Sequence, residues 1–598
     1  MAALKIENLI TDHLDLWTAA VRPKSSAGRG SNSKLELTGI KKLRELILEL
    51  AVRGKLVPQD PNDEPASVLL ERIAVEKARL VKEGKIKKPK ALPEIGEEEK
   101  PFELPEGWEW CRLDELSLTS EAGWSPQCDN TPRKNEQWGV LKVSAVTWGK
   151  FLAEENKALP EPLEPKPEYE VLPGDFLISR ANTAELVARA VIAPANTPCK
   201  LMMSDKIIRF RFSHFVNSSY ICLANGSCTS REYYSRVAGG TSSSMKNVSR
   251  LQIQNLVIAL PPLSEQKRIL DNCEKLMALC DQLELRSESQ LAAHQTLVEA
   301  LLATLTDSTD ADELAQNWAR LSTHFDTLFT TEASIEALKQ TILQLAVMGK
   351  LVPQDPNDEP ASALLARIAA EKAQLVKDKI IKKEKPQPFI SEDGRLFELP
   401  NGWIWSNIGE TFLVTGGLQK TPKRTPVLNH YPYLAVANVQ RGRLELDDLK
   451  RFEVTSEELE RYRLMPGDLM VVEGNGSENE IGRCAIWSGE VQDCLHQNHL
   501  IKCRPLSLDL SSWVLQTLNS PFGIAVMKSL AVTSSGLYNL SVGKIRSIAF
   551  PLPPLKEQHR IVAKVDGLMA LCDQLKSRLQ TSQQTHLKLV DSLVEQAF

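Results

Sequence analysis

The chain contains two copies of the same sequence pattern. Residues 54–67 read GKLVPQDPNDEPAS, and residues 349–362 repeat the same fourteen letters 295 positions later. The register holds along the chain, since FELPEGWEW from Phe102 returns as FELPNGWIW from Phe397, and LPPLSEQKRI returns as LPPLKEQHRI. Repetition at this spacing indicates duplicated domains rather than a solenoid of short repeats.

Stretches of about 160 residues separate these blocks, an ordinary size for one domain. The two copies share only scattered residues there. A preserved frame with differing inserts suits a protein that holds two similar modules in fixed geometry while each module recognises something different. We expect an N-terminal frame with a helix and linker at 1–101, modules at 102–262 and 397–554, a central helical frame at 263–396, and a closing helix at 555–598.

The composition is typical of a globular protein. Its net charge gives the chain as a whole no electrostatic attraction for nucleic acid. Of 598 residues 42% are hydrophobic, and 72 basic against 77 acidic side chains leave a formal charge of −5. The N-terminus lacks the uninterrupted apolar core of a signal peptide, and no segment has the roughly 18 consecutive apolar residues of a membrane span. Eleven scattered cysteines without a CxxC favour reduced thiols. We therefore expect a cytoplasmic protein without a membrane partner.

Each copy is expected to contain one long and one shorter helix. Apolar residues recur with alternating steps of four and three, the heptad pattern of a coiled coil. About 40 residues of helix would span some 60 Å, longer than a compact domain needs, so these helices are interpreted as spacers. The shorter helix precedes each fourteen-residue block and ends at its glycine. The seams are Ile269, Cys273, Leu276, Cys280 and Leu283, resuming at Leu297 and Leu301, and Ile561, Val565, Leu568, Cys572 and Leu575, resuming at Leu589 and Leu593.

The order of the elements predicts a closed arrangement. The central frame contains a long helix, a connector, a shorter helix and the GKLVPQDP turn, and the two chain ends hold the same elements split between them. Joined in space, the ends would rebuild the central unit, and a faint likeness between residues 9–17 and 321–329 agrees with this. We expect an α+β protein in which long antiparallel coiled-coil spacers separate two similar modules, each a mixture of helices and short strands, in a cyclic, pseudo-twofold body.

Two windows at equivalent places in the modules contain no acidic residue. They are residues 233–264, with Arg236, Lys246 and Arg250, and residues 510–556, with Lys528, Lys544, Arg546 and Lys556. Because phosphate repels carboxylates, such windows are typical of surfaces that face a polyanion. Buried core strands also lack acidic residues, but GGTSSSMKN and TSSGLYN are too polar and too rich in glycine for a core.

Polar loops in these windows are the best candidates for nucleic-acid contact, because hydroxyl, amide and basic groups suit phosphate oxygens and base edges. The shared Thr, Ser and Asn should position the backbone, whereas the unlike Lys246 and Tyr538 could discriminate sequence. Helix capping would explain Ser249 and Ser541 but not the whole loop. A second pair of loops shares an asparagine, which a tight turn explains equally well. The candidates are Thr241, Ser242, Ser243, Lys246 and Asn247, then Thr533, Ser534, Ser535, Tyr538 and Asn539, and, from the second pair, Arg180, Asn182 and Asn475.

No motif predicts catalysis. The GxxxxGK[ST] loop is missing, as are the Asn-Pro-Pro-aromatic and Asp-Pro-Pro-aromatic tetrapeptides that hold an exocyclic amine. Asp175 and Asp468 lie in PGD turns, which we expect them to shape. His294 and His586 interrupt the helix seams, where a polar residue that sets the register is a better interpretation than catalysis.

One cluster has the residue types of a zinc site: Cys494, His496, His499 and Cys503. The first module has Leu201, Met203, Lys206 and Phe210 at the equivalent positions, so its fold needs no metal there. Alternation along a strand is the better interpretation, and zinc remains a minor alternative. We predict that the chain binds no metal or cofactor.

The ordered combination of these blocks resembles a known family. Duplicated LPPLxEQxRI before a long heptad helix, modules that open with GWxW, a PGD turn, and GKLVPQDPNDEPA after the shorter helix are similar to the specificity subunit of Type I restriction-modification enzymes, over essentially the whole chain. The resemblance implies two target recognition domains, each reading one half of a split, asymmetric site in double-stranded DNA. It also implies that the helices fix the spacing and dock two modification subunits.

The same resemblance places the chemistry on partner subunits. Modification subunits would bring S-adenosylmethionine and methylate adenine, while restriction subunits would bring ATP- and Mg-dependent translocation and cleavage. The chain itself would then be a non-catalytic subunit. Two alternatives stay open: a stand-alone DNA-modifying enzyme would need a catalytic loop in its modules, and a coiled-coil scaffold without DNA affinity would not need acid-free loops on both.

Overall fold

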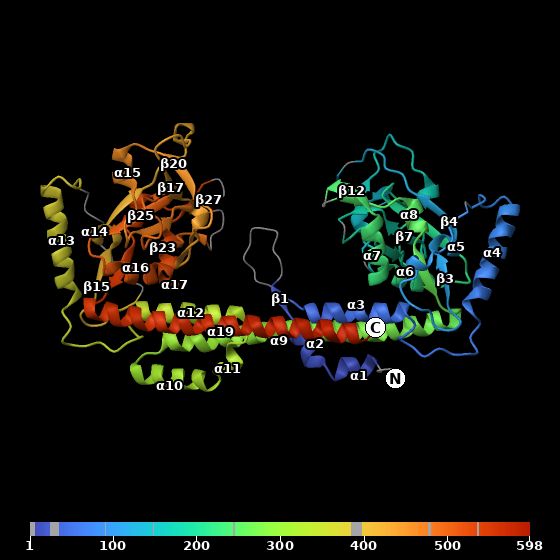
Figure 1. Ribbon diagram of the computed structural model, residues 1–598, viewed down its shortest axis with the longest axis horizontal. Coiled ribbons are helices and arrows are strands. Elements are labelled where there is room, and N and C mark those ends of the chain that lie inside the picture. Colours follow the sequence, from blue (N-terminus) through green and yellow to red (C-terminus); the bar gives the residue numbers. More distant parts are fainter. Residues whose placement is uncertain are drawn as a thin grey trace. The chain divides into compact units, whose positions relative to one another are not determined.

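A computed structural model of the chain gives the positions of most residues. Its described residues fall into two compact units, whose elements are labelled in Figure 1. The first unit comprises Met1–Arg22, Leu35–Glu288 and Gln583–Phe598, and the second comprises Pro23–Lys34 and Ser289–Ser582. The structure describes residues 6–23, 35–89, 91–128, 130–134, 136–147, 149–183, 185–242, 245–383, 397–475, 480–534 and 537–597.

Each unit is built on the same helical frame. The long helices α9 (Leu263–Asp307) and α19 (Leu555–Gln596) each contribute residues to both units. In the first unit α3 (Thr38–Val52) contacts both of them, and in the second unit α12 (Glu332–Val347) takes the same place. The two chain ends therefore supply to the first unit what the central frame supplies to the second, as the sequence predicted. Shorter frame helices are α1 (Ile6–Thr11), α2 (Leu14–Ala19), α4 (Ala66–Lys82), α10 (Ala311–Thr323), α11 (Phe325–Leu328) and α13 (Ala361–Lys377).

Equivalent ion pairs hold the shorter helix to a long helix in each unit. Arg44 of α3 donates to Asp281 of α9 at 2.6 Å, and its counterpart Lys339 of α12 pairs with Asp573 of α19. Lys42 of α3 also pairs with Asp591 near the end of α19. This last contact ties described residues from the two ends of the chain into one unit.

The first halves of the predicted heptad seams are buried or partly buried, and in the second halves the buried stripe moves to other residues. Beyond the histidines the prediction is wrong, because Leu297 is 51% exposed and Leu589 is 49% exposed. An α-helix drifts by about 20° per heptad against a strict seven-residue repeat, so four heptads move the buried stripe by almost one residue. The buried residues are Ile269, Cys273, Leu276, Cys280, Val298, Leu302 and Leu305 in α9, and Ile561, Val565, Cys572, Leu587 and Val590 in α19.

The duplicated fourteen-residue block attaches each module to the start of a long helix. Gly54 follows α3 with a φ of +66°, a conformation that favours glycine. Gln59 Nε2 donates to the Gly54 carbonyl at 2.6 Å and to Glu265 Oε1 of α9 at 3.1 Å. The other carboxylate oxygen of Glu265 accepts from Trp108 Nε1 at 3.0 Å. Because Glu265 is 1% exposed, burial raises the pKa of its carboxyl.

The second copy repeats these contacts residue for residue. Gln354 Nε2 donates to Glu557 Oε1 at 3.1 Å, and Trp403 Nε1 donates to Glu557 Oε2 at 3.0 Å. Burial raises the pKa of Glu557 as well. Gln59 and Gln354 are thus identical residues of the duplicated block that contact the start of a long helix in the same way in both copies.

The two modules share a strand plan. In the first module a four-stranded sheet has the order β4-β11-β7-β9, and in the second the order is β16-β25-β21-β23. A separate ladder, β3 with β14 or β15 with β28, joins the first strand of each module to its last. The first module contains β3 (Glu109–Arg112), β4 (Ser117–Ala122), β5 (Gly139–Leu141), β6 (Asn156–Ala158), β7 (Phe176–Ser179), β9 (Ala190–Ile192), β10 (Leu201–Met202), β11 (Ile207–Phe212), β14 (Val257–Leu260), α5 (Leu113–Leu116), α6 (Ser218–Gly226), α7 (Cys228–Val237) and α8 (Arg250–Gln254). The second contains β15 (Ile404–Asn407), β16 (Phe412–Gly416), β17 (His430–Leu434), β18 (Val439–Gln440), β19 (Arg443–Leu444), β20 (Lys450–Glu453), β21 (Leu469–Val472), β23 (Cys484–Ile486), β24 (Leu495–His496), β25 (Leu500–Pro505), β28 (Ala549–Leu552), α14 (Ile408–Thr411), α15 (Ser456–Tyr462), α16 (Leu510–Asn519), α17 (Pro521–Leu530) and α18 (Val542–Arg546).

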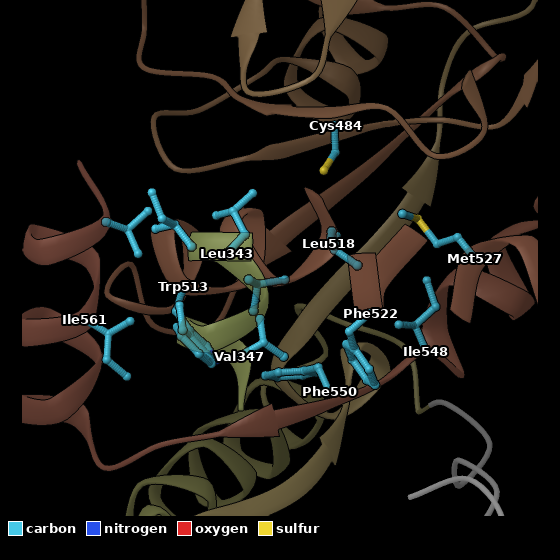
Figure 2. Close-up of a cluster of buried hydrophobic side chains, with 14 of the residues drawn as sticks. Leu343, Val347, Cys484, Trp513, Leu518, Phe522, Met527, Ile548, Phe550 and Ile561 are labelled. Carbon is cyan, nitrogen blue, oxygen red and sulfur yellow. The ribbon is translucent and has the colours of Figure 1, made fainter. Parts of the chain in front are cut away.

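In the second unit the module and the frame share one hydrophobic core, shown in Figure 2. Val347 of α12, Trp513 of α16 and Ile561 of α19 belong to the same buried cluster, together with Phe550 of β28. Burial of such side chains contributes about 1.5–3 kcal/mol each. Because the cluster is continuous, the orientation of this module is set by the frame helices packed beneath it.

The structure describes no helix that is both long enough and apolar enough to cross a membrane. None of the eleven cysteines, all of which the structure describes, is joined to another in a disulfide.

Candidate nucleic-acid interface

In the first module, a small sheet brings together the two loops that the sequence had singled out separately. Strand β8 (Ala181–Asn182) pairs antiparallel with β13 (Met245–Asn247), which also pairs with β12 (Gly239–Ser242). Lys246 lies opposite Asn182, and Asn247 lies opposite Ala181.

The second module repeats this small sheet with β22 (Gly474–Asn475), β27 (Leu537–Asn539) and β26 (Val532–Ser534). Tyr538 lies opposite Asn475, and Asn539 lies opposite Gly474. A Cβ on Gly474 would lie 2.4 Å from Asn539 Oδ1, whereas the first module has Ala181 at the equivalent position opposite Asn247. Lys246 and Tyr538 therefore occupy the same register position in two equivalent sheets.

In the first small sheet, some candidate side chains are exposed, whereas others make hydrogen bonds within the protein. Asn247 is exposed, whereas Lys246 is partly buried and donates from Nζ to the Gly240 carbonyl at 2.9 Å. Asn182 Oδ1 accepts from the Thr183 N–H at 2.9 Å, which supports the turn interpretation of this asparagine. Arg180 is partly buried, and its backbone N–H donates to the Lys206 carbonyl at 2.9 Å.

In the second small sheet, Asn539 is exposed and Tyr538 is partly buried, with its ring packed against the module's hydrophobic core. Five candidates have their backbone in these strands without a described side chain: Thr241, Ser242, Asn475, Thr533 and Ser534. Ser243 and Ser535 lie outside the described residues.

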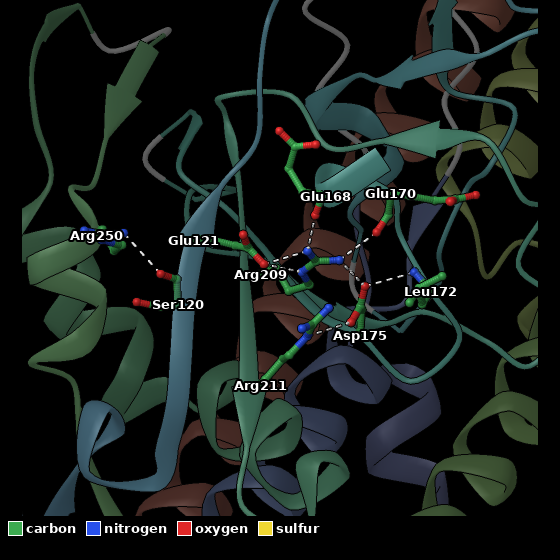
Figure 3. A network of polar contacts seen from close by, with 9 residues as sticks. All are labelled: Ser120, Glu121, Glu168, Glu170, Leu172, Asp175, Arg209, Arg211 and Arg250. Atoms are coloured by element: carbon green, nitrogen blue, oxygen red, sulfur yellow. Dashed lines mark hydrogen bonds and ion pairs between the residues drawn. The ribbon is translucent and has the colours of Figure 1, made fainter. Parts of the chain in front are cut away.

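Several polar residues of the acid-free windows have structural partners. Ser249 Oγ accepts from the Gln252 N–H at 3.2 Å and Ser541 Oγ from the Lys544 N–H at 3.4 Å, so both serines cap short helices as the alternative proposed. Arg250 donates to the Ser120 carbonyl at 3.1 Å, a contact drawn in Figure 3. These windows therefore combine structural contacts with exposed polar positions.

The aspartates of the PGD turns shape those turns, and each also pairs with an arginine. Asp175 Oδ2 accepts from the Leu172 N–H at 2.9 Å and from Arg209 Nη1 at 2.8 Å (Figure 3). Asp468 Oδ2 accepts from the Met465 N–H at 2.8 Å. The prediction of a structural role is confirmed for both aspartates.

The buried cation differs between the modules. Arg209, 2% exposed, also donates to Glu121 at 2.6 Å and to the carbonyls of Glu168 and Glu170 (Figure 3). The second module has Lys502 at this place on the equivalent strand, and burial lowers the pKa of its ammonium to about 8. The residue two positions further on, Arg504, pairs with Asp468 instead.

The zinc-like cluster does not assemble. His496 is fully buried with Nδ1 3.2 Å from the Tyr462 carbonyl, and burial, followed by the charge of Lys502, lowers its pKa to about 3. His499 is exposed and lies 3.7 Å from Glu473. Within the described part of the chain, no three His, Cys, Asp or Glu side chains are placed to hold a metal.

His294 makes a polar contact within the helical frame. Its Nε2 lies 3.2 Å from the Thr327 carbonyl, next to α11. His586 is partly buried in α19. The position of His294 agrees with a structural role.

Comparison with known proteins places the chain in a family. A family model described as the Type I restriction modification DNA specificity domain matches residues 105–293. The Type I restriction enzyme EcoAI specificity subunit of Escherichia coli is 44% identical over 601 residues, covering 99% of this chain and 100% of that protein. The chain belongs to the family of Type I restriction enzyme specificity subunits. The EcoEI specificity subunit of Escherichia coli is 43% identical over 608 residues, again with 99% and 100% coverage.

A similar solved structure, the HsdS subunit from Thermoanaerobacter tengcongensis, covers 84% of this chain and 98% of its own, at 18% identity and a TM-score of 0.37. Family membership confirms the resemblance inferred from the ordered blocks of the sequence.

Proposed function

We propose that this chain is the DNA-recognition subunit of a Type I restriction-modification complex and that each module reads one half of a split site. One observation carries the proposal: β8 pairs with β13 in the same register as β22 pairs with β27, but Lys246 stands in one pair where Tyr538 stands in the other. A lysine donates to the acceptors of guanine, whereas a tyrosine hydroxyl both donates and accepts, so the two sheets would prefer different bases.

The residues common to both sheets would position the DNA rather than read it. Asn247 and Asn539 are exposed at equivalent positions, where their amides can contact phosphate or sugar. We assign the same positioning role to Arg180, Asn182 and Asn475 beside them and to the hydroxyl-bearing turns, which contain Thr241, Ser242, Ser243, Thr533, Ser534 and Ser535.

The catalytic work would belong to partner subunits. We propose that the duplicated frame docks two modification subunits, which bring S-adenosylmethionine, and that restriction subunits bring ATP and Mg. The isolated chain should then show no methyl transfer, cleavage or ATP hydrolysis, and turnover by the pure chain would contradict this. Native mass spectrometry should find two bound modification subunits, and one copy at saturation would argue against the docking scheme.

The recognition scheme is tested by substitutions in the complete methylating complex. K246A should change the preference at one base pair of the first half-site by about 1–3 kcal/mol and leave the second half unchanged. Y538F keeps the ring against the core, removes only the hydroxyl, and should affect the second half alone. N247A should weaken methylation of all sequences together. K150A, which removes an exposed lysine elsewhere on the first module, serves as the control.

Selection from a library with both half-sites randomised measures these effects. A K246A complex with unchanged preferences in both halves would refute direct reading by Lys246. DNA binding by the unsubstituted complex that is insensitive to salt would refute the polyanion-facing surface itself.

A further inference from the structure

The loop that leads into β17 of the second module presents two aliphatic side chains to solvent. Val427 is 72% exposed and Leu428 is 85% exposed, which makes Leu428 the most exposed large hydrophobic side chain that the structure describes. Single exposed apolar residues are common on proteins, but an adjacent pair at a loop tip is more informative when the backbone holds it in place.

The backbone of this tip is fixed by a single carboxylate. Glu453 of β20 accepts from the N–H groups of Val427 at 2.8 Å, Leu428 at 3.1 Å and Asn429 at 2.7 Å. Arg424, three residues earlier, forms a two-pronged contact with Glu458 at 3.2 and 2.8 Å. The apolar pair is therefore displayed on a pre-ordered backbone, which reduces the entropy lost when a ligand binds.

The strands beneath the tip are paired and packed together. His430 at the start of β17 pairs with Glu453, and Tyr433 stacks on Phe452 with ring centroids 3.7 Å apart. Both rings are buried. The tip thus stands on a packed ladder.

The loop lies in a third acid-free window of the chain. Residues 411–444 contain no Asp or Glu, although about one residue in eight of the whole chain is acidic. Lys420 and Lys423 are exposed, and the described residues offer them no hydrogen bond or ion pair. The corresponding stretch of the first module, WSPQCDNTPRKNEQWG, contains two acidic residues and lacks the aliphatic pair. This combination of cations and apolar groups belongs to the second module alone.

Backbone hydrogen bonds connect the base of the loop to the small sheet. The Leu418 N–H donates to the His496 carbonyl at 2.9 Å, and the Asn498 N–H donates back to the Leu418 carbonyl at 2.8 Å. The Glu473 N–H, immediately before β22, donates to the His499 carbonyl at 2.9 Å. The loop therefore starts from the segment that borders the proposed recognition strands.

We infer that Val427 and Leu428 contact thymine methyl groups in the half-site read by the second module, with Lys420 and Lys423 on the adjoining phosphates. The thymine methyl is the apolar group that B-DNA presents among the hydrogen-bonding edges of its major groove, and lysines neutralise the phosphates that flank it. This inference rests on the proposed function and adds an apolar contact to the polar ones of the small sheet.

The test uses the complete methylating complex and a library randomised in both half-sites. V427S/L428S should lower the preference for thymine at one or two positions of the second half-site by about tenfold, and leave the first half-site unchanged. L508S removes an equally aliphatic side chain that is 70% exposed elsewhere on the same module, and it should change nothing. Both variants alter only exposed side chains, so folding is preserved.

Replacing each thymine of the preferred second half-site with deoxyuridine then locates the contact. With the unsubstituted complex, one of these DNAs should be methylated about tenfold less efficiently than thymine DNA. With the V427S/L428S complex, the same DNA and thymine DNA should be methylated equally well. An unchanged thymine preference in the variant would overturn the inference while leaving the split-site function standing. So would loss of bound subunits in native mass spectrometry without any change of preference. A complex without any preference in either half-site would instead overturn the proposed function.

Discussion

Replacing His496 with methionine should make the second module more resistant to acid. The imidazole of His496 is fully buried, and burial together with Lys502 lowers its pKa to about 3. The first module has Met203 at the equivalent position, also buried, so methionine is compatible with the shared fold.

The sign of the effect follows from proton binding. A folded-state pKa of about 3, against about 6.5 for an unperturbed histidine, means that the unfolded chain binds one more proton between these values. Stability that is present above pH 6.5 is therefore lost as the pH falls through that window, by about 1.4 kcal/mol per pH unit. Between pH 7 and pH 4.5 the second module should lose about 3 kcal/mol from this residue, and H496M should not lose it. H496M also loses the polar contact with Tyr462, which costs about 1 kcal/mol at every pH.

Hydrogen exchange at pH 7 and pH 4.5, corrected for intrinsic exchange rates, measures how much stability each module loses between the two pH values. Peptides from β21 and β25 report on the second module, and peptides from β7 and β11 of the first module provide an internal reference. H499M replaces an exposed histidine three residues away and should follow the unsubstituted chain. If H496M loses as much protection as the unsubstituted chain over this interval, the acid sensitivity does not arise from His496 and the reasoning fails.

Three further outcomes are expected. W403F removes the N–H that donates to the buried Glu557, and it should lower the free energy of unfolding by about 1.5–3 kcal/mol, as urea unfolding can measure. Because burial raises the pKa of Glu557, this loss of stability should be larger at pH 8 than at pH 5. An equal loss at both pH values would contradict this. R209A breaks a buried ion pair and should destabilise the first module by about 3–5 kcal/mol. R211A replaces a half-exposed arginine of the same strand and should cost less than about 1 kcal/mol. Hydrogen exchange can measure both losses of stability. A fragment of residues 1–333 should form a twofold dimer, because the end of α9 from a second copy can replace the missing end of α19, and analytical ultracentrifugation showing only monomer at micromolar concentration would refute the predicted closure.

The frame was predictable because its residues make contacts that repeat along with the sequence. Gln59, Trp108 and Glu265 form one hydrogen-bonded group, and their counterparts are spaced almost identically in the second copy. These contacts explain why the frame residues are the same in both copies. The seam beyond His294 could not be read from heptads alone, because the drift of a straight helix against a seven-residue repeat accumulates with length.

The sequence identified the separate loops of the candidate site but did not predict that they pair in one small sheet. Strands of two or three residues, such as β8 and β13, are too short to give a periodicity signal, so the pairing of Asn182 with Lys246 was invisible in the sequence. The packing of Tyr538 on the core was missed for the same reason. By contrast, the window at 411–444 could have been found by the absence of acidic residues that revealed the other two windows.

The way the small sheets are held explains how one frame can carry two recognition surfaces. Their register is set by backbone pairing, with Lys246 opposite Asn182 in one module and Tyr538 opposite Asn475 in the other. Exchange of a side chain at such a position leaves the ladder intact, because the hydrogen bonds that hold the strand belong to the main chain. The contacts that orient each module lie elsewhere, where Trp108 donates to Glu265 and Trp403 donates to Glu557, with the same residue types in both copies. In the proposed recognition scheme, a substitution at the Lys246 or Tyr538 position would therefore change which base is preferred and leave the backbone pairing of the strand in place.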